Sequence, residues 1–367
     1  MNEELICFSG VDFTNFIMFV KSMSSKDRDK SVKLALLQVK EGSLICKSRD
    51  CSSNLIEYKV DLYDGSTCLE DSFAVSINDM AALIKCANGN VFKIRKSFGQ
   101  YEFNIIGDGW LPFKTAEADE SKFMIFGNEV QLGSINSTKL KNNISFILGY
   151  TQECTYARDK YIRFNSNSMV ATSRLSSVIV NDSFPEMTLH RDDAAMLKNL
   201  LKDNFDLKVF KVEDSVERIK FSGQKFNLTI VAANVETVSS SSISDISGYI
   251  TVECDDLYKL TSFAEEYSSS KHIIGMSIKD NSLNISIKNV LAAKHNSKLN
   301  AQFTGVVENT TNEAGVPTHN LLKALRLFQD KHSRSINIYI TNKLLNEQNC
   351  IILFDDNTQA KINIYNR

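Results

Sequence analysis

The chain has 367 residues, of which 43% are hydrophobic and 23% charged, so it can bury the cores of two or three globular domains. Its formal net charge of -2 excludes a protein that coats nucleic acid through uniform positive charge, so any DNA contact needs a local basic surface. The acidic N-terminal residues, and the lack of any apolar run approaching the roughly 20 residues of a membrane span, predict a cytoplasmic protein with no membrane contact. The eight cysteines lack Cys-x-x-Cys spacing and indicate reduced thiols, with disulfides or a metal site as the alternative.

Six segments share one pattern, in which a short alternating strand runs into a polar capping residue and then into an amphipathic helix. In chain order, the helices are predicted to begin near residues 12, 78, 136, 190, 255 and 317. Each carries apolar side chains at the spacing of one helical face, as Phe13, Phe16, Ile17 and Val20 do in the first. Asp, Asn, Ser or Thr stands at each start, where its side chain accepts a hydrogen bond from a free N–H group. Starts about 60 residues apart indicate a repeated supersecondary unit.

Between the helices, alternating apolar segments predict strands, among them 33–39, 43–46, 91–94, 101–105, 228–231, 336–340 and 351–354. The unit is therefore a strand, a helix and three further strands, and two units make a domain of ordinary size. The sequence predicts an α+β fold of three tandem domains at residues 1–124, 125–246 and 247–367, each with two helices packed on antiparallel sheets. The serine run 239–242 is predicted to be the second linker.

Two hairpins and this three-domain spacing carry a resemblance to a known family. Residues 37–44 and 158–175 are similar to the first long hairpin and the middle-domain hairpin of the bacterial beta sliding clamp, the beta subunit of DNA polymerase III. Of that family's Ala-Thr-Asp-Gly-His-Arg-Leu motif, the chain keeps Ala171, Thr172, Arg174 and Leu175 but lacks the Gly-His pair. The family's Phe-Pro-Asp/Glu-Tyr segment, expected near 234–243, is absent, and residues 364–367 replace its usual Met-Pro-Met/Val-Arg. This divergence suggests a clamp of phage or mobile-element type.

The resemblance implies that two three-domain subunits join head to tail as a homodimer, forming a six-domain DNA-clamp ring whose helices line a hole for double-stranded DNA. Phosphate attraction is independent of base sequence, so it suits a ring that must hold DNA and still slide. Each lysine alone is also compatible with a merely solvated helix face. In the fifth helix, Glu265 and Glu266 offset the nearby lysine. Helical wheels place the following cations on or beside the polar helix faces, or in the loop after the first helix: Lys21, Lys26, Arg28, Lys85, Lys139, Lys141, Lys198, Lys202, Lys259, Lys323 and Arg326.

The resemblance also implies a hydrophobic pocket between the second and third domains that captures short peptides of DNA polymerases and clamp loaders. The loss of the Gly-His pair and of the proline-methionine end is expected to reshape this pocket and its partner motif. The alternative is that the matching residues are core residues at strand ends. They are Thr172, Arg174, Leu175, Ile362, Ile364 and Tyr365.

Ring closure is expected to pair two open strand edges. One would lie around Tyr101, Phe103 and Ile105, and the other around His272, Ile273 and Ile274.

No enzyme, cofactor or metal site is predicted. The five histidines lack zinc-site spacing, and the sequence has neither a phosphate-binding loop nor a nucleophile elbow. The aspartate pairs 192–193 and 255–256 stand at helix starts, where capping and the helix dipole explain them better than a metal site does. Two other hypotheses stay open: a non-closing clamp-fold regulator of host replication, and a structural β-rich assembly protein. The basic helix faces favour the clamp.

Overall fold

The computed structural model describes residues 4–24, 34–50, 52–64, 66, 72–87, 90–105, 107, 109–117, 119–151, 160–173, 176–213, 216–233, 246, 248–267, 272–279, 282–288, 294–305, 307, 313–330, 333–340, 350–356, 358–363 and 365–366. The chain divides into a first unit, residues 1–140 and 196–232, and a second unit, residues 141–195 and 233–367. Each unit is mixed α and antiparallel β.

The six predicted helices are confirmed, and each begins within two residues of its predicted start. They are α1 (Gly10–Ser24), α2 (Ile77–Cys86), α3 (Ser137–Thr151), α4 (Arg191–Leu200), α5 (Cys254–Tyr267) and α6 (Thr318–Asp330). The capping prediction holds at α3, where Asn136 Oδ1 accepts from the Lys139 N–H at 3.1 Å. It shifts by two residues at α2, where Ser76, and not Asn78, caps the helix through the Asp79 N–H at 3.4 Å.

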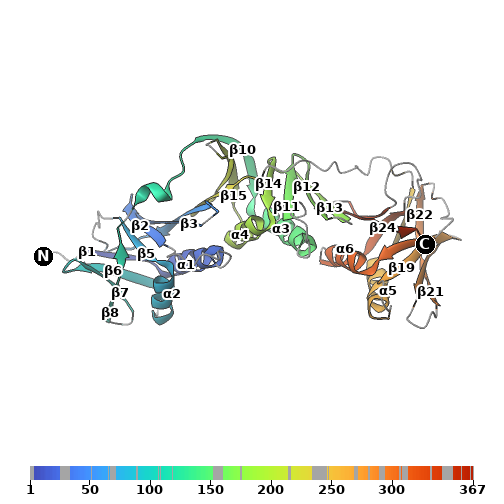
Figure 1. Cartoon of the computed structure of the whole chain (residues 1–367), viewed down its shortest axis with the longest axis horizontal. Helices are drawn as coiled ribbons and strands as arrows, with labels where there is room; N and C mark the ends of the chain where they lie inside the picture. Colours follow the sequence, from blue (N-terminus) through green and yellow to red (C-terminus); the bar gives the residue numbers. More distant parts are fainter. Residues whose placement is uncertain are drawn as a thin grey trace. The chain divides into compact units, whose positions relative to one another are not determined.

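The described residues of the first unit form two sheets, and several of their strands are labelled in Figure 1. A four-stranded sheet runs in the order β1 (Glu4–Ser9), β6 (Val91–Ser97), β7 (Gln100–Asn104) and β8 (Trp110–Phe113). A nine-stranded sheet runs in the order β10 (Asn128–Asn136), β15 (Asp206–Glu213), β16 (Arg218–Ser222), β17 (Phe226–Val231), β4 (Leu55–Asp61), β3 (Ser43–Arg49), β2 (Leu34–Lys40), β5 (Phe73–Ser76) and β9 (Thr115–Ala116). The pairing of β17 with β4 joins strands of the predicted first and second domains into one sheet.

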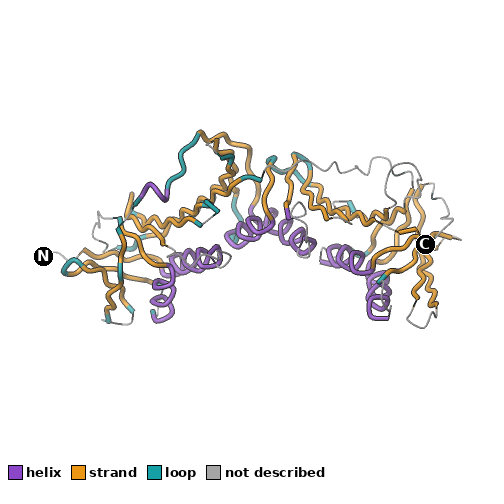
Figure 2. Tube along the Cα trace, viewed as in Figure 1, coloured by secondary structure: helices purple, strands orange, loops and turns teal. Residues whose placement is uncertain are grey.

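The second unit repeats this arrangement. Its nine-stranded sheet runs in the order β14 (Met187–His190), β11 (Tyr161–Asn165), β12 (Ser168–Ser173), β13 (Ser176–Asn181), β26 (Thr358–Asn363), β25 (Cys350–Phe354), β24 (Ser335–Ile340), β18 (Gly248–Glu253) and β22 (Gln302–Gly305). A five-stranded sheet runs in the order β21 (Lys294–Asn300), β20 (Ser282–Lys288), β19 (Ile273–Lys279), β23 (Ala314–Pro317) and β27 (Tyr365–Asn366). Within each unit, the helices lie on one side of the strands (Figure 2).

The cores form where the predicted apolar helix faces meet the sheets. Phe13, Phe16 and Ile17 of α1 are fully buried. The Phe13 ring meets that of Phe8 edge-on, with centroids 5.0 Å apart. The apolar stripe of α6 is covered in the same way, since Leu321, Leu325 and Phe328 have no exposed surface. Burial of such side chains contributes roughly 1.5–3 kcal/mol each and anchors the helices to the sheets.

The predicted ring-closing edges were wrong. Tyr101 and Phe103 lie on β7, which is paired on both sides, with β6 and with β8. Ile273 and Ile274 lie on β19, which is paired with both β20 and β23. These segments are apolar because they are interior strands whose side chains fill the core, and Phe103 is fully buried. Among the described residues, the strands at the ends of these two sheets are β1 and β8, and β21 and β27.

Candidate nucleic-acid interface

Helix α1 presents a nearly uncharged surface to solvent. Its exposed positions include Val11 and Met18, which are 56% and 54% exposed, and Lys21 near its end. Asp12, at its first turn, is only 13% exposed and pairs with Lys225 Nζ at 2.7 Å. The charge of α1 itself is therefore weak, and its one acidic side chain is already matched by a cation.

A lysine from far along the chain supplements α1. Lys202 Nζ donates to Asn15 Oδ1 at 2.7 Å, although the two residues are 187 positions apart. Lys202 follows the end of α4 and remains exposed while making this contact. The Asn15 amide thus holds a predicted DNA-contacting cation against α1, which no local sequence pattern indicates.

The other predicted cations of the first unit also lie on helices. Lys85 is exposed in the last turn of α2, where the helix dipole favours a positive charge. Lys139 is exposed at the start of α3, and Lys198 is half-buried in α4. Lys26 and Arg28 fall outside the described residues.

In the second unit, the predicted cations are exposed or half-exposed on three helices: Lys141 on α3, Lys259 on α5, and Lys323 and Arg326 on α6. Arg326 Nε donates to the Tyr258 hydroxyl at 3.3 Å and so links α6 to α5. This hydrogen bond lowers the pKa of Tyr258 below its usual value. Tyr258 is thus a polar partner on this surface that sequence reasoning missed.

Of the two glutamates expected to offset Lys259, one makes contacts beyond α5. The Glu265 carboxylate accepts a hydrogen bond from the Thr318 hydroxyl at the start of α6 and lies 3.6 Å from His272 Nδ1. Glu265 is therefore engaged between α5, α6 and the start of β19. Glu266 remains exposed on α5.

The predicted peptide pocket is described only in part. Arg174, Leu175 and Ile364 lie outside the described residues, and of Tyr365 only the backbone is described, paired with Gly315. Thr172 lies opposite Ser177, whereas Ile362 lies opposite Ser176. Because alternate residues of a strand face opposite sides, this register places Thr172 and Ile362 on different faces of the sheet. Ile362 has no exposed surface and belongs to the core, as the alternative reading of these residues expected.

Within the described part of the chain, no three or more His, Cys, Asp or Glu side chains gather into a possible metal site. None of the described helices combines the length and apolar character needed to cross a membrane.

The fold of this chain is also found in proteins whose structures have been solved. Neither protein-family models nor curated proteins compared by sequence match the chain. Among solved structures, the DNA polymerase III subunit beta of Pseudomonas aeruginosa is similar with a TM-score of 0.76 and 14% identity, over 98% of this chain and 99% of that one. The DNA polymerase sliding clamp of Bacillus subtilis is similar with a TM-score of 0.76 and 13% identity, over 99% of both chains. The beta subunit from DNA polymerase of Streptococcus pyogenes is similar with a TM-score of 0.76 and 11% identity, over 99% of this chain and 100% of that one.

Proposed function

We propose that this chain, which has the fold of the bacterial sliding clamps, is a non-enzymatic, cytoplasmic processivity factor that encircles double-stranded DNA and tethers a DNA polymerase to it. The observation that supports this proposal most is the distribution of charge. Each of the six helices buries an apolar face and carries at least one lysine that is exposed or half-exposed, although the whole chain has a net charge of -2. A structural assembly protein has no need of this arrangement.

The chemistry required of such a surface is modest. Lysine ammonium groups attract phosphates without reading bases, and the attraction weakens as salt rises because bound counterions are released. Long lysine side chains can also pass from one phosphate to the next without fixing a register, which allows sliding. The contact made by Asn15 with Lys202 leaves that ammonium two further donors for phosphate oxygens.

The test is a charge reversal at lysines on the helices or directly after one. Replacing Lys85, Lys202 and Lys323 with Glu is expected to shorten retention on nicked circular DNA several-fold and to flatten its dependence on salt. A matched control reverses three exposed lysines that lie on strands, namely Lys59, Lys208 and Lys279, and changes the net charge equally. Circular dichroism checks that both variants fold. Equal retention of the two variants would remove the support for a helix-lined hole.

Closure of the ring is proposed to use the described sheet ends β8 and β21. Near β21, Phe263 and Tyr267 of α5 stack with ring centroids 4.9 Å apart and are 42% and 41% exposed. The His295 ring of β21 meets the Phe263 ring edge-on, with centroids 5.7 Å apart. Exposed aromatic surface beside an open sheet edge is typical of a protein interface. Pro112 of β8 supplies no N–H group, so the aromatic contact is expected to contribute more than the strand pairing.

Solution mass tests closure directly. Two chains of 41.3 kDa make a dimer of 82.6 kDa, which light scattering over a range of concentrations should detect. Phe263→Ser is expected to weaken the dimer at least tenfold, whereas Phe126→Ser, at a 68% exposed phenylalanine, is the control and should not. A wild-type chain that stays monomeric would instead favour a non-closing regulator of host replication.

The proposed tether is a peptide pocket around Thr172, with Arg174, Leu175, Ile364 and Tyr365 as the further candidates. Thr172 is half-exposed in β12, which is compatible with a place at a pocket rim. Polymerase and clamp-loader peptides are the expected ligands. Leu175→Ala is expected to weaken binding of such peptides while leaving DNA retention unchanged. Unchanged peptide affinity would place the tether elsewhere.

A further inference from the structure

Two lysines of the predicted second domain contact helix α1, and they differ in the kind of acceptor that they meet there. Lys225 Nζ lies 2.7 Å from a carboxylate oxygen of Asp12 and 2.9 Å from one of Asp61 on β4. Lys202 Nζ instead donates at 2.7 Å to the amide oxygen of Asn15, about one turn after Asp12. A carboxylate neutralises its lysine, whereas an amide holds the ammonium in place and leaves its charge intact. The contact with Asn15 therefore keeps a positive charge at the surface.

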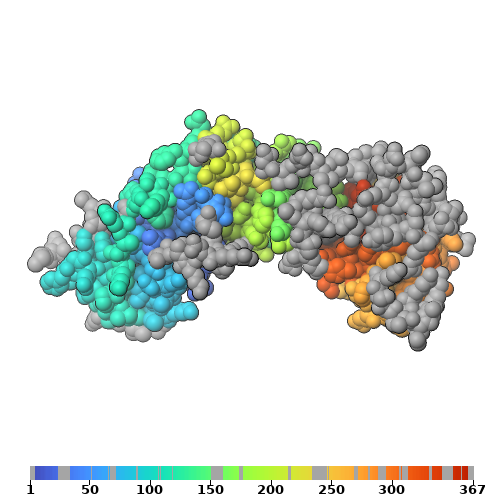
Figure 3. Space-filling model, viewed as in Figure 1, coloured from blue at the N-terminus to red at the C-terminus, as the bar shows by residue number. Residues whose placement is uncertain are grey.

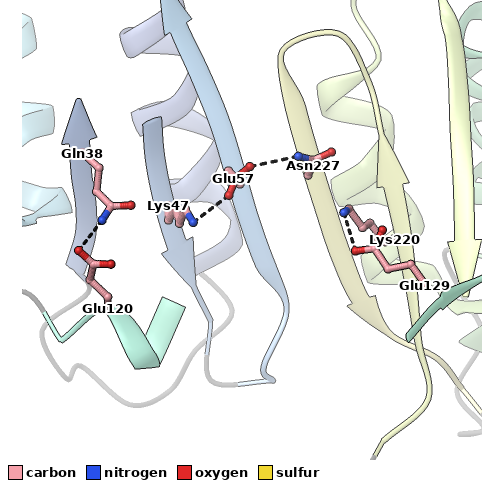
Figure 4. A network of polar contacts seen from close by, with 7 residues as sticks. All are labelled: Gln38, Lys47, Glu57, Glu120, Glu129, Lys220 and Asn227. Atoms are coloured by element: carbon pink, nitrogen blue, oxygen red, sulfur yellow. Dashed lines mark hydrogen bonds and ion pairs between the residues drawn. The ribbon is translucent and has the colours of Figure 1, made fainter. Parts of the chain in front are cut away.

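Two lysines on the nine-stranded sheet of the first unit are paired in the first of these ways. Lys47 Nζ lies 2.9 Å from Glu57 Oε2 (Figure 4). Lys220 Nζ lies 2.7 Å from Glu129 Oε1 in the same view. Figure 3 shows this part of the surface, where residues of the blue, early part of the chain lie beside residues of the yellow, later part. The carboxylates neutralise these sheet lysines, so the amide partner of Lys202 sets it apart from them.

Both members of this amide–lysine pair are held by well-packed parts of the fold. The asparagine lies on α1 directly before Phe16, which is fully buried. The lysine directly follows Leu201, which is 1% exposed. The next residue, Asp203, accepts a hydrogen bond from the Ser137 hydroxyl at 2.6 Å through its backbone carbonyl. The pair is therefore in place before a ligand arrives, which lowers the entropy cost of binding.

The hydrogen bond also fixes which way the asparagine amide faces. Lysine has three donors and no acceptor, so the amide oxygen of Asn15 faces Lys202 and the amide nitrogen, Nδ2, is left to donate elsewhere. Nδ2 has no hydrogen-bond partner among the described residues, and the ammonium keeps two further donors. Nδ2 and Oδ1 are bonded to the same carbon, so donors of both side chains lie within reach of one anion. Lys202 is exposed and Asn15 is partly exposed, so an anion can approach them.

The surface of α1 around Asn15 does not repel an anion. Val11 and Met18, about one turn to either side on the same helix face, are 56% and 54% exposed. Asp12 is the one acidic residue of α1, and it is already ion-paired. Asp203, directly after the lysine, is exposed and is the carboxylate that opposes anion binding at this place.

We propose that Asn15 Nδ2 and Lys202 Nζ together bind one backbone phosphate of duplex DNA, where α1 meets the segment after α4. This inference rests on the proposed clamp function and assigns an uncharged residue of α1 a direct part in it. The lysine supplies the attraction and the amide supplies a second donor, but neither reads a base, so the site is compatible with sliding. A phosphate bound there contacts the predicted first and second domains at once.

The experiment measures binding of the full chain to a short fluorescent DNA duplex by anisotropy over a range of salt concentrations. Lys202→Met is expected to reduce the slope of log affinity against log salt by about 0.9, because one phosphate contact that releases counterions is lost. Asn15→Ala is expected to weaken binding about three- to tenfold with an unchanged slope, because the amide carries no charge. Asn15→Asp should reproduce the slope of Lys202→Met, because a carboxylate neutralises the ammonium. Asp203→Asn should tighten binding.

Two matched controls lie on strands of the same unit. Asn128→Asp makes the same exchange at an exposed asparagine of β10, and Lys208→Met removes an exposed lysine of β15. Both are expected to keep the wild-type affinity and slope. Inorganic phosphate, compared with sodium chloride at equal ionic strength, tests for a site that takes a free anion. It is expected to displace the duplex no more than chloride does.

Three results would overturn the proposal. A wild-type slope in Asn15→Asp would show that this pair contacts no phosphate. Wild-type affinity in Asn15→Ala would reduce the amide to a structural role. Displacement of the duplex by inorganic phosphate that Asn15→Asp abolishes would assign the pair to a free anion. If any of these occurs while the charge reversal of Lys85, Lys202 and Lys323 still shortens retention on circular DNA, this site fails and the clamp function stands.

Discussion

Replacing Lys225 with Met should loosen the junction between the predicted first and second domains. Lys225 lies just before β17, and its Nζ is 2.7 Å from Asp12 Oδ2 and 2.9 Å from Asp61 Oδ2. Its backbone carbonyl also accepts the Lys59 N–H at 2.7 Å, a bond that the substitution keeps. Met preserves most of the aliphatic stem, so the change removes the charge with little loss of packing.

The two carboxylates should contribute unequally. Asp61 is 56% exposed, and an exposed pair contributes about 0–1 kcal/mol. Asp12 is 13% exposed, and a sheltered carboxylate that loses its partner costs about 1–3 kcal/mol. The N-terminal dipole of α1 compensates part of that loss. Together the expected destabilisation is about 1–3 kcal/mol, most of it through Asp12.

A chain of several domains need not unfold in one step, so the assay is hydrogen exchange of the amides in β4 and β17 together with urea unfolding. A double-mutant cycle of Lys225→Met with Asp12→Asn should give a coupling of about 1–2 kcal/mol, and the cycle with Asp61→Asn less than about 1 kcal/mol. A coupling near zero with Asp12, or a larger one with Asp61, would refute the reasoning from burial.

Two further predictions concern the first unit. Phe98 is 99% exposed and has a φ of +48° beside Gly99 at +79°, a turn that prefers Asn-Gly. Phe98→Asn should raise stability by about 1 kcal/mol in thermal unfolding, and a decrease would mean that the ring makes a stabilising contact. The pKa of Glu57 is lowered by Lys47, so its contribution to stability is present above the unfolded pKa of about 4.3 and is lost as pH falls through the folded value. Lys47→Met should make urea midpoints less sensitive to pH below that value, and an unchanged acid profile would contradict this.

The repeat of six helices could be predicted because helical periodicity is a local property. Each apolar stripe has to face a sheet, so residues such as Phe13, Phe16 and Ile17 were identified as core without knowledge of the fold. The same local logic placed Lys85 and Lys259 on exposed helix faces. It was less accurate at helix ends, where Ser76 caps α2 two residues before the predicted Asn78.

Strand order was beyond this reasoning. An apolar alternating strand has the same pattern whether it is interior or at an edge, so β7 and β19 were mistaken for open edges although both are paired on two sides. The register of strand pairing, which the sequence does not show, also decides the positions of residues in the predicted pocket. It places Thr172 and Ile362 on opposite faces of one sheet, which their separate sequence matches do not show.

The sequence by itself determined which residues form helices, which faces of those helices are buried, and that each helix carries at least one lysine outside its buried face. Only the tertiary structure decided that Lys202 meets Asn15 across 187 residues and that Lys225 meets Asp12 across 213. The physical reason is the distance along the chain over which each kind of interaction acts. Helical periodicity depends on neighbours within one or two turns, whereas these contacts depend on strand pairing such as that of β17 with β4, which joins parts of the chain more than 160 residues apart and leaves no local pattern.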